Sequence, residues 1–274
     1  MKNGINVLSL FDGMSCGQIA LERSGIKVNE YYASEIDKYA IKVALSNYPN
    51  TVQLGSVVDL DDFVVEAILP KIDLLIGGSP CQGFSFAGKQ LNFEDPRSKL
   101  FFEYVRLLET LRKTNPEIKF LLENVKMKKE SQDIISGYLG VEPIAINSAL
   151  VSAQTRKRIY WTNIAPLEIP KDRNILLKDI ISDDFYVDRD KSRCIISSIG
   201  RTTKREYFTK NQGQMVFDKK TNLPRKVTPL ECERLQTVPD NYTDSVSNCQ
   251  RYKMLGNGWT IDVIAHIFSS WKQN

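Results

Sequence analysis

The stretch INVLSLFDGMSCGQIALERSG, residues 5–25, decides the fold because it joins a buried strand, a short loop and a helix. Residues 5–10 are mostly apolar, as in a buried strand, and residues 17–25 have the spacing of a helix that ends at Gly25. Gly13 and Gly17 would let the loop backbone approach a ligand, and the helix N-terminus offers free N–H groups. The glycines do not form the GxGxxG fingerprint, which argues against a nicotinamide cofactor.

Strands and helices continue to alternate beyond this unit. We expect strands at 28–35, 72–78 and 118–124, and helices at 37–49 and 100–111. Alternation of this kind predicts an α/β protein with a doubly wound, mostly parallel sheet. In such a sheet, ligands bind beyond the carboxyl ends of the strands.

The alternation stops after a strand at 158–164. Residues 167–224 look irregular, and a regular pattern returns with TPLECERLQ (228–236) and a closing helix, TIDVIAHIFSSW (260–271). We therefore expect a large domain at 1–166, a small domain at 167–224 and a C-terminal segment at 225–274. The last helix of that segment should return to the large domain.

Composition indicates the environment of the protein. The chain has 274 residues, and its five cysteines form no CxxC pair and leave one unpaired in any disulfide scheme, which favours a reducing compartment. The N-terminus lacks the apolar core of a signal peptide, and no stretch approaches the roughly 18 apolar residues of a membrane span. We expect a cytoplasmic protein with no membrane partner.

Positive charge is concentrated in one segment. Residues 191–226 hold ten lysines and arginines against two acids, whereas the whole chain has a net charge of +4. Such a segment suits a polyanion such as nucleic acid, although a solvated lysine-rich loop has the same composition.

Two further patterns point to chemistry at strand ends. Glu35 lies 22 residues beyond Gly13 at the end of the second strand, where an acid can bind both hydroxyls of a ribose. It is either part of an adenosine-containing cofactor site or simply a surface acid. The stretch GGSPCQGFS (77–85) places Cys81 at the tip of a buried strand, directly after a proline.

The surroundings of Cys81 argue against a cysteine hydrolase. The only histidine, His266, falls within the closing helix, so the usual base for a thiol is missing. Glu123, Arg156 and Arg158 stand instead near strand ends of the same expected sheet. A thiol, an acid and two arginines suit conjugate addition to a heterocycle, in which the acid supplies a proton or hydrogen bond to a ring nitrogen.

Taken together, the motifs resemble the cytosine-C5 DNA methyltransferases. LFDGMSCG, SPCQ, ENV, QTRKR, RKVTPLECERLQ and LGNG occur in the order of that family and cover nearly the whole chain, apart from about 167–195. The length is similar to that of bacterial or phage enzymes of restriction–modification type, and the C-terminal part is similar to the animal de novo branch. The resemblance implies the Rossmann-like fold of class I S-adenosylmethionine-dependent methyltransferases, with residues 167–224 as the target-recognition domain.

The resemblance implies a site for S-adenosyl-L-methionine, with S-adenosyl-L-homocysteine as product and no metal. Phe11 and Ile36 would contact the adenine, and Glu35 the ribose. The family has Gly-Asp where this chain has Gly-Ser, so either the Ser56 hydroxyl or Asp59 would contact the adenine. The full set implied for the cofactor is Phe11, Asp12, Gly13, Met14, Ser15, Glu35, Ile36, Ser56, Val57, Pro80, Leu100, Asn257 and Trp259.

The catalytic residues implied are Cys81 as nucleophile, Glu123 as acid at cytosine N3, and Arg156 and Arg158 in support. The target cytosine must leave the base stack, and the loop 82–98 would close over it. The partner would be double-stranded DNA, with a cognate restriction endonuclease acting on the same sites. Residues expected to contact that DNA, through base edges or phosphates, are Ser85, Arg193, Arg201, Lys204 and Arg205.

Two alternatives remain open at this stage. A transfer-RNA cytosine-5 methyltransferase would use the same scaffold, but the Cys-Phe-Thr that marks those enzymes is not found before the final motifs. A catalytically silent nucleic-acid-binding relative would not need the thiol, the acid and both arginines, all of which are present.

Overall fold

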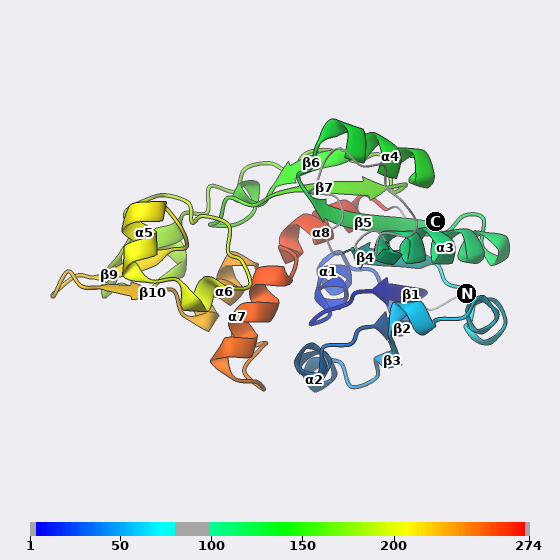
Figure 1. Cartoon of the computed structure of the whole chain (residues 1–274), viewed down its shortest axis with the longest axis horizontal. Coiled ribbons are helices and arrows are strands. Elements are labelled where there is room, and N and C mark those ends of the chain that lie inside the picture. The colour runs from blue at the N-terminus through cyan, green and yellow to red at the C-terminus, as the bar shows by residue number, and fades with distance from the viewer. Residues whose placement is uncertain (1–3, 80–98, 272–274) are drawn as a thin grey trace.

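A computed structural model describes residues 4–79 and 99–271 of the chain. Within these residues the main sheet has seven strands in the order β3-β2-β1-β4-β5-β7-β6 (Figure 1). Strands β1 to β5 are parallel, whereas β7 is antiparallel to both β5 and β6. The strands are β1 (Ile5–Leu10), β2 (Val28–Ser34), β3 (Val52–Gly55), β4 (Leu74–Gly78), β5 (Lys119–Val125), β6 (Ile144–Asn147) and β7 (Lys157–Thr162).

Helices cover both faces of this sheet, as expected for a doubly wound α/β fold. Alternate residues of each strand point to opposite faces, so Leu74 and Leu121 join one core while Leu75 and Phe120 join the other. The first core includes α1 (Cys16–Arg23) and α8 (Ile261–Ser269), and the second includes α3 (Lys99–Thr114) and α4 (Lys129–Leu139). α2 (Lys38–Asn47) follows β2 on the side of the first core.

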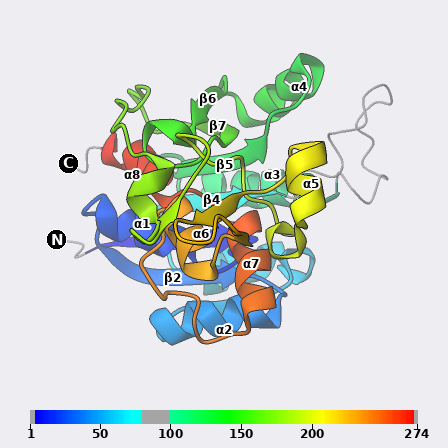
Figure 2. The ribbon, with the colours of Figure 1, turned by 90° about the vertical axis from the view of Figure 1, so that its left-hand side faces the viewer.

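A second, smaller sheet lies at the other end of the elongated molecule (Figures 1 and 2). It is antiparallel, with the order β10-β9-β8, and α5 packs on it through Tyr207, Met215 and Phe217. Its elements are β8 (Phe185–Tyr186), α5 (Lys204–Lys210), β9 (Met215–Asp218) and β10 (Pro224–Lys226). The expectation of an irregular segment at 167–224 was therefore wrong in part, because a capped helix and short strands lie within it.

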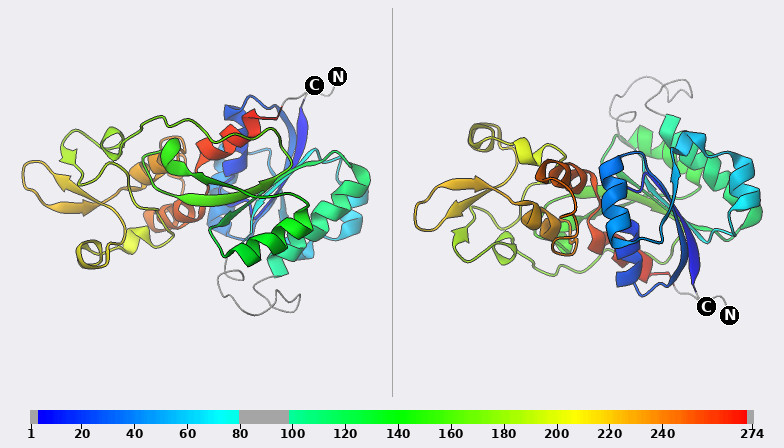
Figure 3. Two further views of the ribbon diagram at one scale, coloured as in Figure 1. Left: turned by 90° about the horizontal axis from the view of Figure 1, so that it is seen from above. Right: turned by 90° about the horizontal axis from the view of Figure 1, so that it is seen from below.

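The chain returns from the small sheet to the large one through α6 (Pro229–Leu235) and α7 (Asn248–Asn257), which lie between the two sheets (Figure 3). Thr228 and Glu231 form a capping box at the start of α6, with Pro229 in its first turn. α8 then packs along α1. Single helical turns lie at 57–59, 64–68, 148–150, 177–180 and 199–201.

The described residues hold no helix that is both long and apolar enough to cross a membrane. The division into domains at residues 166 and 224 stays a prediction.

Candidate active site

The predicted site residues gather at the carboxyl edge of the large sheet. Leu10, the last residue of β1, pairs with Ser34 at the end of β2 and with Gly77 near the end of β4. Gly78 pairs in turn with Glu123 of β5. Since β1 is the strand at which the order of the sheet reverses, the loop after it lies at the topological switch point, where doubly wound sheets bind ligands.

Residues 11–15 form a loop with unusual backbone geometry. Phe11, Gly13 and Ser15 all have positive φ, at 57°, 61° and 61°. Only glycine adopts this region without cost, so Phe11 and Ser15 are held there by surrounding contacts. Such local strain clusters at binding sites, and this loop leads directly into the N-terminus of α1.

Asp12 is a buried residue that holds the loop through hydrogen bonds of its side chain. Its carboxylate accepts hydrogen bonds from Ser15 Oγ and, at 2.7 Å, from Tyr31 Oη. Burial raises the pKa of Asp12 to about 6, because desolvation outweighs the hydrogen bonds that favour its charge. Asp12 therefore supports the loop from the protein interior.

Gly17 lies at a close contact between α1 and the large sheet. It is buried, and a methyl group on it would lie 2.4 Å from Ile76 Cδ1 and 2.7 Å from Tyr31 Oη. Glycine suits this position because α1 packs closely on β2 and β4. Gly13, by contrast, has open space beside it and needs glycine for its positive φ.

Glu35 ties the end of β2 to this loop. Its Oε2 accepts from the backbone N–H of Gly13 at 2.8 Å, and its Oε1 accepts from Ile36 and Asp37 at 2.7 and 2.8 Å. A carboxylate has about four acceptor positions, so capacity remains for a ribose hydroxyl. The three bonds fix the carboxylate in place before any ligand binds.

An exposed apolar side chain follows Glu35 directly in the chain. Ile36 is 77% exposed, which is unusual for an isoleucine and leaves a bare apolar surface beside the carboxylate. Phe11 and Leu100 pack half-buried against the cluster that contains the buried Val57. An acid flanked by exposed apolar surface fits an adenosine group, with the ring on the apolar side chains and the ribose on the acid.

The two candidates for contact with the adenine amino group differ in their surroundings. Ser56 Oγ accepts a hydrogen bond from Val58 N at 3.3 Å and begins the turn at 57–59, which leaves its hydroxyl proton free among the described residues. Asp59 is exposed at the end of that turn.

The turn after α7 closes the site from the other side. A methyl group on Gly258 would lie 3.1 Å from Met14 Cε, and Tyr242 Oη donates to Met14 O at 2.7 Å. A methyl group on Gly78 would lie 2.9 Å from Trp259 Nε1. The turn therefore contacts both the loop after β1 and the tip of β4, while Asn257 is exposed at the end of α7.

Glu123 and Arg158 form a partly buried ion pair at the same edge. Arg158 Nε lies 2.9 Å from Glu123 Oε1, with the side chains 15% and 12% exposed. The other carboxylate oxygen, Oε2, faces Gly78, where an added methyl group would lie 3.2 Å from it. Glu123 lies near the end of β5, as expected, and pairing with β7 extends the strand to Val125.

Arg156 does not share this ion pair. It is 3% exposed, and its guanidinium donates to Ile195 O at 2.9 Å and to Cys194 Sγ at 3.3 Å through Nη1. Through Nη2 it donates to Gly258 O at 2.9 Å and Gly256 O at 3.3 Å. Among the described residues it therefore holds backbone segments together, and it does not contact the acid.

Three expected residues lie outside the described ranges: Pro80, Cys81 and Ser85, together with the loop 82–98. The described cysteines differ in their fitness as nucleophiles. Burial raises the pKa of Cys16 to about 12 and raises that of Cys232 further, so both are held as thiols. Cys194 is half-buried and Cys249 is exposed.

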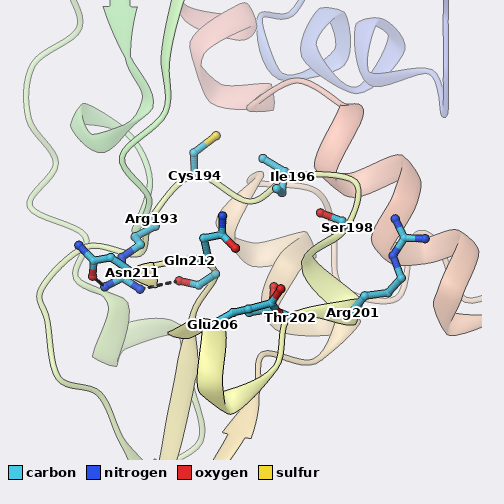
Figure 4. Close-up of a pocket in the computed structure, with 10 residues that line it drawn as sticks. Arg193, Cys194, Ile196, Ser198, Arg201, Thr202, Glu206, Asn211 and Gln212 are labelled. Atoms are coloured by element: carbon cyan, nitrogen blue, oxygen red, sulfur yellow. Dashed lines mark hydrogen bonds between the residues drawn. The ribbon is translucent and has the colours of Figure 1, made fainter. Parts of the chain in front are cut away.

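The basic segment carries a pocket of about 460 Å³, and Arg193, Cys194, Ile196 and Arg201 are among the residues that line it (Figure 4). The guanidinium of Arg193, on the wall of this pocket, already has partners within the protein. It donates to Gly213 O at 3.1 Å and to Asn211 Oδ1, and it lies over the ring of Tyr207. Arg201, Lys204 and Arg205 are exposed and have no side-chain partner in the part of the chain that the structure describes.

Several residues were missed by sequence reasoning. Gln154 and Gln236, both fully buried, hydrogen-bond each other at 2.7 Å and join the loop before β7 to the end of α6. Cys194 Sγ lies within 3.3 Å of Arg156 Nη1 and 4.0 Å of Arg158 Nη2. Both glutamines stand in motifs that the resemblance used, whereas nothing in the local sequence marks Cys194.

No group of three His, Cys, Asp or Glu able to hold a metal ion occurs within the described ranges.

Comparison with known proteins covers the whole chain. The sequence model of the C-5 cytosine-specific DNA methylase family matches residues 5–168 and 153–273. The Type II methyltransferase M1.ScrFI of Lactococcus lactis subsp. cremoris is 30% identical, over 94% of this chain and 75% of its own length. The Type II methyltransferase M.HhaI of Haemophilus parahaemolyticus is 28% identical, over 96% of this chain and 93% of its own length.

Solved structures share the fold. A mutant of Spodoptera frugiperda DNMT2 matches with a TM-score of 0.70 at 21% identity, covering 96% of this chain and 98% of that one. The Entamoeba histolytica methyltransferase EhMeth matches with a TM-score of 0.73 at 18% identity, covering 98% of each.

Proposed function

The chain belongs to the C-5 cytosine-specific DNA methylase family, and we propose that it methylates C5 of cytosine in double-stranded DNA with S-adenosyl-L-methionine as donor. One observation carries the proposal most strongly. The Glu123–Arg158 pair lies at the carboxyl edge of the sheet, beside Gly78 and the turn that contains Trp259. An acid is thus fixed on β5, across β4 from the loop after β1 that is predicted to hold the cofactor.

The residues around the switch point fit the cofactor. Glu35 keeps acceptor capacity for the ribose, and Ile36 and Phe11 offer apolar surface for the adenine. When bound, S-adenosyl-L-methionine supplies an electrophilic methyl group. The contacts of the turn at 256–259 with Met14 and Gly78 would then exclude water from the methyl donor.

The proposed mechanism activates cytosine C5 toward a methyl donor. Cytosine C5 is a poor nucleophile, and addition of the Cys81 thiolate at C6 makes the C5–C6 unit enamine-like. Glu123 protonates or hydrogen-bonds N3 as electrons move into the ring, and Arg158 holds the acid in place. After C5 has accepted the methyl group, loss of its proton and expulsion of the Cys81 thiolate restore the aromatic ring.

The target base has to leave the duplex, since C6 and N3 are inaccessible in a stacked pair. The free basic side chains on and beside α5, Arg201, Lys204 and Arg205, are proposed to hold the DNA. Because bacterial and phage methyltransferases are among its relatives, we propose that the chain acts in such cells, with a restriction endonuclease of the same target as functional partner.

One experiment tests the function and finds the target together. The protein is expressed in a host that lacks DNA methylation, and its plasmid is sequenced after bisulfite conversion. We expect cytosines to be protected within one short sequence. A Glu123→Gln strain is the matched control and should show little protection. Complete conversion despite abundant folded protein would overturn the proposal, and methylated transfer RNA from the same cells would favour the alternative substrate.

A further inference from the structure

Arg156 is a buried cation bound to main-chain carbonyls of two different segments. Its guanidinium joins Ile195 O to Gly256 O and Gly258 O, at distances between 2.9 and 3.3 Å. Gly256 belongs to the last turn of α7, where free carbonyls and the helix dipole favour a positive charge. The arginine therefore caps α7 and holds residue 195 to it.

A second contact joins the same two segments. A methyl group on Gly256 would lie 2.1 Å from the carbonyl carbon of Ile196 and 2.2 Å from Ser197 N. The backbone at 196–197 thus rests directly on the backbone of α7, and no side chain fits between them. Ile195 N is fixed as well, since it donates to the buried Gln154 Oε1 at 3.2 Å.

Each segment faces a different predicted ligand. Cys194 and Ile196 line the pocket of the basic segment, with Ile196 53% exposed (Figure 4). The turn at 256–258 lies against Met14 of the predicted cofactor loop, because a methyl group on Gly258 would approach Met14 Cε to 3.1 Å. The side chain of Arg156 contacts both segments.

We propose that Arg156 is a positioning residue that couples DNA binding to cofactor binding, and that it does not act on the base. Both of its terminal nitrogens are used by Cys194, Ile195 and the turn at 256–258, so the group cannot reach a substrate while those bonds hold. When DNA binds, it fixes the pocket wall at 194–197. Through Arg156, this also fixes the turn at 256–258, which closes on the cofactor. By linkage, cofactor must then tighten DNA binding by the same factor.

The inference rests on the proposed function, and its test uses the target found by plasmid sequencing. Binding of a duplex with that target is measured by fluorescence anisotropy, with and without S-adenosyl-L-homocysteine. We expect the ligand to tighten DNA binding about tenfold in the wild-type protein. In Arg156→Lys the ratio should fall to about one, because an ammonium group cannot span the carbonyls of residues 195 and 258 as a guanidinium does.

Arg158→Lys is the matched control, since it changes the neighbouring arginine that pairs with Glu123. It should lose methyl transfer and keep the tenfold ratio. If Arg156→Lys does not fold by circular dichroism, Gly256→Ala makes the same test, because its methyl group separates residue 196 from α7. Two results would overturn the inference and leave the proposed function intact. In the first, wild-type protein methylates DNA but its DNA affinity does not change with S-adenosyl-L-homocysteine. In the second, a folded test variant keeps the full tenfold ratio of DNA affinities.

Discussion

At the scale of single residues, the candidate site depends on side chains that are fixed before any ligand binds. Glu35 is held by three backbone N–H groups, and Glu123 by Arg158. The identity of these acids could be predicted from their positions near strand ends. Their partners could not all be predicted, since Arg156 contacts residues 38 to 102 positions away, and no local pattern records such contacts.

Replacement of Glu35 by alanine should weaken cofactor binding. The substitution removes charge-assisted acceptors for the ribose and also frees Gly13 N, so we expect a loss of about 1.5–3 kcal/mol. Isothermal calorimetry with S-adenosyl-L-homocysteine measures it. Glu30→Ala, which removes an exposed acid from the same strand, is the control and should bind normally. Equal affinity in the two variants would refute the assignment of Glu35.

Replacement of Glu123 by glutamine should separate proton donation from positioning. The amide oxygen can still accept from Arg158 Nε, so the local geometry is retained while the acid is lost. Methyl transfer should fall by about 10²–10⁴ with cofactor affinity unchanged. Glu117→Gln, at an exposed position just before β5, should keep full activity. Wild-type rates in Glu123→Gln would show that the acid is another residue.

Asp12 should make stability depend on pH. Its folded-state pKa of about 6 lies above the ordinary value of 3.8, so the folded protein binds more protons than the unfolded chain between these values. Stability from this group is therefore present below about pH 4 and is lost as pH rises through 6, by up to roughly 3 kcal/mol. In urea titrations from pH 4 to 6.5, Asp12→Asn should lose less stability than wild type. An identical pH dependence in both proteins would contradict this account.

At the scale of elements, the large sheet was largely predictable and the small one was not. β1, β4 and β5 are each mostly apolar, which is the pattern of a strand covered on both faces. β8 has only two residues and β10 three, so no alternation can develop in them. The short helix α5 is instead stabilised by its capping box, Thr203 with Glu206.

The side chains of α5 lead to a prediction about salt. Lys204 is exposed in the first turn and has no side-chain partner among the described residues, so it is free to contact a phosphate. Lys204→Ala should reduce the slope of log affinity against log salt by about one unit. Lys113→Ala, on α3 and paired with Glu66, should leave the slope unchanged. If the affinity for DNA did not depend on salt concentration, residues 191–226 would not be a DNA-binding surface.

At the scale of the whole molecule, buried polar contacts join the C-terminal segment to the loop before β7. Gln236 donates to Leu255 O at 2.8 Å and to Gly258 O at 3.0 Å, and Gln154 donates to Leu235 O at 2.8 Å. Buried amides whose hydrogen bonds are satisfied fix the relative position of the segments they join. Gln154 also accepts from Ile195 N of the basic segment at 3.2 Å, so these amides connect that segment with the C-terminal segment, in agreement with the coupling proposed for Arg156.

The most direct test of the account is covalent trapping on DNA. A duplex with 5-fluorocytosine at the target position is incubated with the protein and S-adenosyl-L-methionine. Addition of Cys81 at C6 and methylation at C5 should proceed, but the final elimination would have to remove fluorine as a cation, so the adduct should persist. We expect a shifted band in denaturing electrophoresis that depends on the cofactor. Cys81→Ala should abolish the band and Cys194→Ala should keep it, and a fluorinated transfer RNA should trap poorly. A band that survives in Cys81→Ala would contradict the account, because the nucleophile would then be another residue.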